Sequence, residues 1–296
     1  MAVRQDTIWE RFLKPAVRLL IDEEKLQQFY KSIDWQAESD RFQRPDLIYP
    51  DYYRTQNFHG IEGGYLNGSA ATSYDAVTQY VLPPNEMWVR QGLIDAIQGT
   101  PRRILDLGCG TGSTTLMLKQ GFPQAEVIGL DLSPYMLVVA DRKAKTAGLD
   151  IEWCHGKAEE TGFPDADFDL VTASLLFHKT PTTVTKSILR ECFRIMKAGG
   201  QVLILDGNQN TLRQFNILCE VFEEPYIKDY AASSVDAWMG AAGFEAVQSK
   251  DLWWMHQVTR GMKPIPVQQG TASVHRVNKS STIDDFGSEG IAAPAF

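Results

Sequence analysis

The segment RILDLGCGTGSTT, from Arg103 to Thr115, carries three glycines at alternate positions directly after a short apolar run. Glycine has no Cβ and tolerates positive φ, so glycines at this density let a backbone approach a ligand closely. The apolar run predicts a strand, and the residues after Gly112 predict a helix. In open α/β sheets a loop of this kind binds a ligand at the carboxyl end of its strand.

Strands and helices alternate on both sides of this segment. Strands are expected at about residues 104–107, 127–130, 151–154, 169–173, 202–205, 245–248 and 252–259. Helices are expected at 114–120, from Ser133 as N-cap to Gly148, at 183–197 with a stop at Gly199-Gly200, and from a Ser233–Asp236 start to Gly243. This order predicts the α/β class: a Rossmann-like doubly wound sheet of seven strands, mostly parallel with an antiparallel edge strand, plus an N-terminal helical lid.

Three parts are expected along the chain. Residues 1–100 form an N-terminal helical and lid region, 101–260 the α/β domain, and 261–296 a disordered tail rich in Pro, Ser and Gly. The helices before residue 36 either roof the site or make a homodimer contact. The segment 50–75, PDYYRTQNFHGIEGGYLNGSAATSYD, has neither helical nor strand periodicity and crowds aromatic residues together, which predicts a lid over a substrate pocket or else a packed omega loop.

Composition excludes several classes of function. The 296 residues carry a net charge of −8 without a basic cluster, which argues against a nucleic-acid partner. The four cysteines are widely spaced, so neither a zinc site nor a disulfide framework is expected, and no metal is expected. No apolar run is long enough to span a membrane, and the N-terminus lacks an apolar signal core, so a cytoplasmic protein without an integral membrane segment is predicted.

The acidic residues near the glycines indicate what the loop binds. A triphosphate loop needs Gly-Lys-Ser/Thr, but Gly112 is followed by Ser-Thr-Thr. Asp106 would repel a pyrophosphate and attract an ammonium group, and Asp131 at the end of the second strand can accept both hydroxyls of a ribose. An amine beside a ribose without phosphate describes S-adenosylmethionine. A nicotinamide oxidoreductase remains an alternative, because the glycine spacing differs from the dinucleotide fingerprint by one residue.

Four motifs then resemble a known family. ILDLGCGTG, VIGLDLSPYML, GKAEETGFPDADFDLVTASLLFH and ILRECFRIMKAGGQVLILD are similar to the successive motifs of class I S-adenosylmethionine-dependent methyltransferases, the ubiquinone/menaquinone-biosynthesis-like small-molecule (type 11) subgroup. The resemblance covers residues 103–206 closely and 233–259 loosely. It implies an enzyme that transfers a methyl group from S-adenosylmethionine, leaving S-adenosylhomocysteine, to O, N or C of a small, partly apolar metabolite such as a quinone-like or aromatic acceptor. A protein that only binds the adenosyl ligand remains an alternative.

The resemblance also implies roles for particular residues. Those assigned to the cofactor are Asp106, Gly108, Cys109, Gly110 and Gly112 at the methionine moiety, Asp131 at the ribose, Leu132, Met136, Ala158 and Glu159 around the adenine, and Ser174 and Leu175 beneath the methionine chain. The chain departs from the subgroup at Lys157, where relatives often have an aspartate that bonds the adenine amine. Cys109 is expected to pack rather than to act as a nucleophile.

The acceptor side is assigned in the same way. His178, just past the fourth strand, is the candidate general base, with loop capping or water ordering as the alternative role. His59 and Tyr65 are the candidate catalytic residues of the lid. The aromatic residues expected to line the substrate pocket are Tyr52, Tyr53, Phe58, Phe215, Phe222, Tyr226 and Tyr230.

Overall fold

The computed structural model describes residues 21–58, 61, 63–81, 85–222 and 224–266. The elements that follow all belong to one compact unit, Met1–Ile265. Residues 267–296, most of the expected tail, lie outside the described residues, as do the N-terminal residues 1–20. Gly261 and Met262 were expected in the tail, but they pair with Val202 and Gln201 and so belong to the last strand.

A seven-stranded sheet forms the centre, in the order β3-β2-β1-β4-β5-β7-β6. The strands are β1 Arg103–Leu107, β2 Glu126–Asp131, β3 Glu152–His155, β4 Phe168–Ser174, β5 Met196–Gly207, β6 Glu245–Leu252 and β7 His256–Met262. The first five run parallel, and β7 is antiparallel to both β5 and β6. The predicted fold class is confirmed, with two antiparallel strands at one edge.

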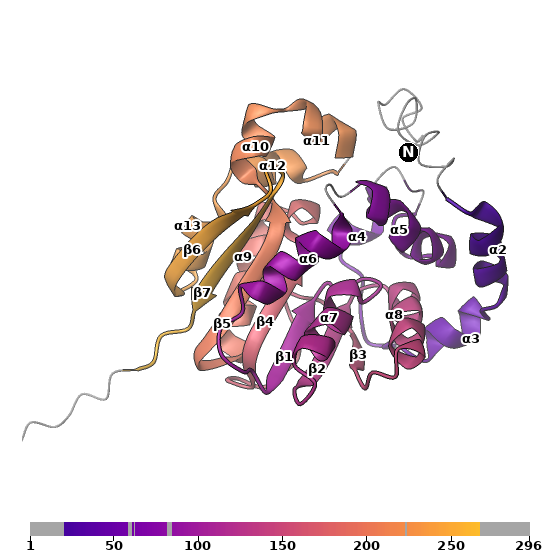
Figure 1. Cartoon of the computed structure of the whole chain (residues 1–296), viewed down its shortest axis with the longest axis horizontal. Coiled ribbons are helices and arrows are strands. Elements are labelled where there is room, and N and C mark those ends of the chain that lie inside the picture. The colour runs from indigo at the N-terminus through magenta and orange to yellow at the C-terminus, as the bar shows by residue number, and fades with distance from the viewer. Residues whose placement is uncertain (1–20, 59–60, 62, 82–84, 223, 267–296) are drawn as a thin grey trace, which may run out of the picture. The chain divides into compact units, whose positions relative to one another are not determined.

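Helices cover both faces of the sheet (Figure 1). The helices α6 Glu86–Asp95 and α7 Ser113–Gly121 pack with Val89, Leu93 and Leu118 against Ile104 and Leu170 on one face. The helices α9 Thr182–Ile195 and α13 Val235–Ala241 pack against the residues that point the other way. Both faces of the parallel strands are therefore apolar, because side chains alternate along a strand.

The chain has further helices in its described part. They are α2 Glu23–Lys31, α3 Trp35–Asp40, α4 Asp51–Arg54, α5 Gly68–Val81, α8 Pro134–Thr146, α10 Gln209–Gln214, α11 Ile217–Phe222 and α12 Ile227–Ala231, with a short 3₁₀ turn η3 Phe177–Lys179 after β4. The prediction that residues 50–75 lack helical structure is wrong at Asp51–Arg54 and again from Gly68 onward. The Asn67 side chain accepts a hydrogen bond from the Ala70 N–H and so begins α5.

Two predicted boundaries are also wrong. The N-cap of α13 is Ser234, whose hydroxyl accepts from the Ala237 N–H, whereas the Ser233 hydroxyl donates to the Asp229 carbonyl. Gly199 and Gly200 do not end the helix before the fifth strand, because β5 already begins at Met196. The Gly199 N–H donates to the Lys263 carbonyl, and the Lys263 N–H donates to the Gly200 carbonyl, so the sheet continues through both glycines.

No helix in the described part of the chain combines the length and hydrophobicity that a bilayer span needs.

Candidate active site

The glycine loop lies at the carboxyl end of β1, between β2 and β4. Gly108, Gly110 and Gly112 adopt φ of +61°, +54° and +79°, the left-handed region that favours glycine. A Cβ on Gly108 would lie 2.7 Å from a Leu176 methyl carbon, and one on Gly112 would lie 2.7 Å from the Trp153 ring. A Cβ on Gly110 would meet no protein atom within 4 Å. Gly110 therefore faces open space, whereas the other two allow close packing of the chain on itself.

Asp131 ends β2 and holds this loop in place. One carboxylate oxygen accepts from the Gly110 N–H at 2.8 Å, and the other accepts from the Ser133 N–H at 2.8 Å. Burial raises the pKa of the carboxyl above its ordinary value, although these backbone bonds oppose the shift. Asp131 as a whole is 8% exposed, and it lines a cavity.

The first cavity, of about 690 Å³, lies at the carboxyl ends of β1, β2 and β4. It brings together most of the predicted cofactor residues with the predicted lid. Those that line it are Gly108, Gly110, Asp131, Leu132, Met136, Ala158, Ser174 and Leu175, together with Tyr52, Tyr53, Phe58 and Tyr65. Its position is the switch point where the strand order reverses, which is where open α/β sheets bind their ligands.

Four predicted cofactor residues do not line this cavity. The Asp106 carboxylate is 1% exposed and accepts from the hydroxyls of Thr115 and Thr172 at 2.7 and 2.8 Å. Glu159 accepts from the hydroxyl of Tyr52, a residue that does line the cavity, at 3.0 Å. Cys109 packs behind the loop near Gly129, and Gly112 faces Trp153.

The buried Asp106 should make stability depend on pH. Burial raises its pKa from 3.8 to about 6, so the folded protein binds the proton more tightly than the unfolded chain. The free energy of unfolding of the wild type should therefore fall as pH rises between about 4 and 6. We expect Asp106→Asn to match the wild type near pH 4 and to exceed it by about 3 kcal/mol above pH 6.

Urea unfolding of both proteins from pH 4 to 7.5 measures this difference. If the difference in free energy of unfolding between the two proteins does not change with pH, the assignment of the raised pKa to Asp106 is wrong.

A second cavity, of about 590 Å³, adjoins the first and shares Tyr74, Leu175 and Lys179 with it. Its other lining residues are Thr78, His178, Gly207, Leu212, Phe222, Ile227, Met255 and His256. Leu175 adopts φ of +57°, a conformation that is rare for a branched residue and is found mainly where surrounding contacts hold it. Its N–H donates to the Leu205 carbonyl at 2.8 Å, which fixes the wall between the two cavities.

The predicted aromatic residues of residues 207–232 are only partly in this second cavity. Phe222 lines it. Tyr230 is buried and donates to the Gly207 carbonyl at 2.8 Å, with its ring 6.4 Å from that of His178. Tyr226 donates to the Tyr52 carbonyl at 3.3 Å, and Phe215 is 52% exposed beside Trp254. The structure therefore places Phe215 on the surface rather than in the pocket.

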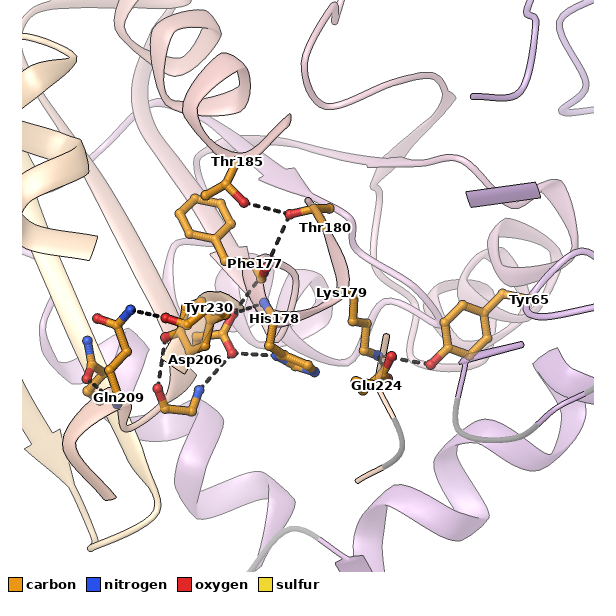
Figure 2. A network of polar contacts seen from close by, with 12 residues as sticks. Tyr65, Phe177, His178, Lys179, Thr180, Thr185, Asp206, Gln209, Glu224 and Tyr230 are labelled. Carbon is orange, nitrogen blue, oxygen red and sulfur yellow. Dashed lines mark hydrogen bonds and ion pairs between the residues drawn. The ribbon is translucent and has the colours of Figure 1, made fainter. Parts of the chain in front are cut away.

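His178 is held by a carboxylate that the sequence interpretation missed. Its Nδ1 lies 2.5 Å from an Asp206 oxygen, and the other Asp206 oxygen accepts from the Phe177 N–H at 2.8 Å (Figure 2). Burial alone would raise the pKa of Asp206, but His178 and the backbone N–H groups around it hold this pKa below its ordinary value. Asp206 is the next-to-last residue of β5, and Asp131 is the last residue of β2. An acidic residue near a strand end was therefore the signal that the sequence offered.

Two further residues of the second cavity were missed as well. His256 is 3% exposed, and its Nδ1 has no hydrogen-bond partner among the described residues. Burial lowers its pKa to about 4, so the ring is neutral at pH 7 and offers a polar atom to a ligand. Lys179 lies on the wall between the cavities, and only its position next to His178 could have indicated it.

His59, the other lid candidate, lies outside the described residues. Within the described ranges no group of three or more His, Cys, Asp or Glu side chains is arranged to hold a metal ion.

Comparisons with known proteins agree with this geometry. Residues 104–200 match the family model described as a methyltransferase domain. A demethylmenaquinone methyltransferase of Thermus thermophilus is 39% identical over 135 residues, covering 46% of this chain and 60% of that protein. One of Deinococcus radiodurans is 34% identical over 139 residues, covering 47% and 57%. The chain thus spans less than two thirds of the length of either relative.

Among solved structures, phosphoethanolamine N-methyltransferase 2 of Haemonchus contortus in complex with S-adenosyl-L-methionine shares the fold, with a TM-score of 0.50 and 14% identity. The similarity covers 74% of this chain and 61% of that one. The sheet order, with a cavity at its switch point, defines a Rossmann-like α/β domain. In sequence, residues 104–200 are similar to a methyltransferase domain, and 46% of the chain is similar to a demethylmenaquinone methyltransferase.

Proposed function

We propose that this protein transfers a methyl group from S-adenosylmethionine to a small, partly apolar acceptor of the phenolic or quinone-like class. The observation that carries the proposal is the shared wall at Leu175 and Lys179. On one side lies a cavity with the glycine loop and Asp131, and on the other lies a cavity with the His178–Asp206 pair. Two ligands bound in these cavities meet at that wall.

The first cavity fits the cofactor. The open space in front of Gly110 accommodates a chain that approaches the backbone closely, and the exposed edge of the Asp131 carboxylate can accept ribose hydroxyls. Leu132, Met136 and Ala158 provide an apolar wall for a flat base. When bound, the cofactor supplies a methyl group that is already activated by its sulfonium.

The second cavity supports the acceptor class. Leu212, Phe222, Ile227 and Met255 make most of its wall apolar, and the imidazoles of His178 and His256 supply polar atoms. The relatives named above methylate a demethylmenaquinone, a quinone-derived compound, which is consistent with such a wall. Because Nδ1 of His178 faces Asp206, we assign Nε2 as the atom that takes a proton from the acceptor.

The buried tyrosines and phenylalanine of the lid exclude water from this meeting point. Phe58 and Tyr65 are 1% and 6% exposed, and their rings stack with centroids 5.3 Å apart. Since the methyl donor is already activated, positioning and exclusion of water supply most of the catalysis.

Removal of the Asp131 carboxylate should weaken cofactor binding. We expect Asp131→Ala to raise the Kd for S-adenosylmethionine at least about tenfold, because charge-assisted hydrogen bonds contribute roughly 1.5–3 kcal/mol each. Asp131→Asn is the matched control: it keeps one acceptor oxygen for the ribose or the Gly110 N–H, and should lose less. Titration calorimetry measures both, and an unchanged Kd for Asp131→Ala would remove the ribose assignment.

The function itself is tested by product analysis. The protein is incubated with S-adenosylmethionine that carries a labelled methyl group and with hydroquinones bearing short prenyl chains, simple phenols, catechols and amines. We expect label in a hydroquinone or phenol. Binding of S-adenosylhomocysteine without transfer to any acceptor would instead favour a non-catalytic binder, and binding of NADH in its place would favour an oxidoreductase.

A further inference from the structure

Lys179 places a buried positive charge where the two cavities meet. Its side chain is 12% exposed and lines both cavities. Its ammonium donates to the Tyr65 hydroxyl at 3.0 Å and to the Tyr74 hydroxyl at 3.5 Å, and lies 4.9 Å and 5.4 Å from the centroids of these two rings. Figure 2 shows Lys179 pointing toward Tyr65, with Glu224 beside it.

Acidic groups around the ammonium keep it charged. Burial alone would lower the pKa of Lys179, but Tyr74, Glu224 and Asp206 outweigh burial and raise it. Asp131 also faces it, since Lys179 acts to lower the pKa of that carboxyl. The Glu224 carboxylate lies 3.9 Å away, close enough to balance the charge but beyond hydrogen-bond distance, so the ammonium can direct a proton to a ligand.

By itself, the positive charge of Lys179 disfavours binding of the proposed cofactor, because the cofactor also carries a positive charge. A sulfonium bound in the first cavity brings a second positive charge toward Lys179 in a site from which water is excluded, where like charges repel strongly. A negative atom between the two cations removes this repulsion and is attracted by both. The acceptor atom occupies that position.

We propose that Lys179 binds the acceptor oxygen as an oxyanion, so that the protein selects phenols and enols over amines. This inference rests on the proposed function and names the chemical state of its acceptor. The O–H bond of the acceptor breaks, its proton goes to Nε2 of His178, and its electron pair stays on the oxygen beside the Lys179 ammonium. The Asp206 carboxylate lies against Nδ1 of His178, so the positive charge that the transferred proton brings to the ring is paired with a negative one, and the site stays balanced in charge.

A coloured phenol tests the oxyanion site without turnover. 4-Nitrophenol is bound in the presence of S-adenosylhomocysteine, and the visible band of its phenolate is followed against pH. A cation in contact lowers the pKa of an acid by roughly 1–3 units, so we expect the bound probe to ionise about 1–2 units below its value in water. In Lys179→Met this shift should disappear.

Lys179→Met leaves the buried Glu224 without its cation and can reduce stability, so a double variant is needed. Lys179→Met/Glu224→Gln removes both charges. If Lys179 serves only to neutralise Glu224, the double variant should behave as the wild type toward the probe. If Lys179 binds the oxyanion, the double variant should stay folded and still lack the shift. Glu224→Gln alone should keep the shift.

The outcomes separate the two proposals. A probe that fails to bind the wild type, or that ionises there as in water, overturns the oxyanion site, even if methyl transfer to a phenol is observed. A shifted probe without methyl transfer to any acceptor contradicts the proposed function and leaves the oxyanion site standing. Methylation of amines at rates equal to phenols would contradict the inferred selectivity.

Discussion

Gly110→Val should abolish cofactor binding while the protein remains folded. Gly110 lines the first cavity, and a Cβ at this position would point into space that no protein atom occupies within 4 Å. A branched side chain there fills the space that we assign to the methionine moiety of the cofactor. We expect the Kd for S-adenosylhomocysteine to rise at least roughly a hundredfold, about 2.7 kcal/mol, as measured by titration calorimetry.

The backbone conformation of Gly110 requires a control, because φ of +54° is strained for valine wherever it occurs. Gly148 provides one, since it has φ of +65°, no atom within 4 Å of a built Cβ, and a place just after α8 away from both cavities. Gly148→Val should lower the Tm by a similar amount and leave cofactor affinity unchanged. If Gly110→Val still binds S-adenosylhomocysteine as the wild type does, the placement of the ligand against the loop is wrong.

His178→Ala should impair turnover far more than cofactor binding. A general base contributes roughly 10²–10⁴ in rate, so we expect kcat/KM to fall by about this factor. The Kd for S-adenosylmethionine should stay within a few-fold, because His178 lines the second cavity and not the first. Activity should recover in part at high pH, where the acceptor ionises in solution.

Asp206→Asn separates orientation from proton transfer. The amide keeps the shape of the carboxylate but cannot stabilise a protonated His178, so turnover should fall even though the imidazole is present. A loss below about tenfold in His178→Ala, without pH recovery, would mean that the acceptor needs no base at this position. The His178–Asp206 pair would then be a structural contact of the loop after β4.

The fold was predictable because its signals are local. The apolar runs of strand length, the glycines from Gly108 to Gly112 and the helix cap at Ser133 each depend only on residues close to them in the sequence. The boundary errors at Ser234 and Met196 have different origins. The error at Met196 arises because Lys263, far along the chain, extends the sheet through the two glycines of β5. The error at Ser234 is a choice between two adjacent serines, which local contacts with Ala237 and Asp229 decide.

The glycine loop and Asp131 at the first cavity were predictable because their places follow from the order of the strands. Gly110 and Asp131 end or follow neighbouring parallel strands, whose carboxyl ends meet at one edge of the sheet, and the structure brings them within 2.8 Å. Asp106 shows the limit of that argument. It also lies near the end of its strand, but its carboxylate accepts hydrogen bonds from Thr115 on α7 and Thr172 on β4.

The sequence by itself therefore determined the α/β class, the parallel sheet with its antiparallel edge, and the loop that faces the first cavity, since each follows from short-range periodicity and backbone geometry. Only the tertiary structure decided the chemistry of the second cavity. His178 meets Asp206 near the end of β5, and Lys179 meets Tyr65 of the lid and Glu224 from the segment before α12. His256 enters from β7. These groups lie far apart along the chain, and no local pattern specifies contacts that arise when separate elements pack around one buried charge.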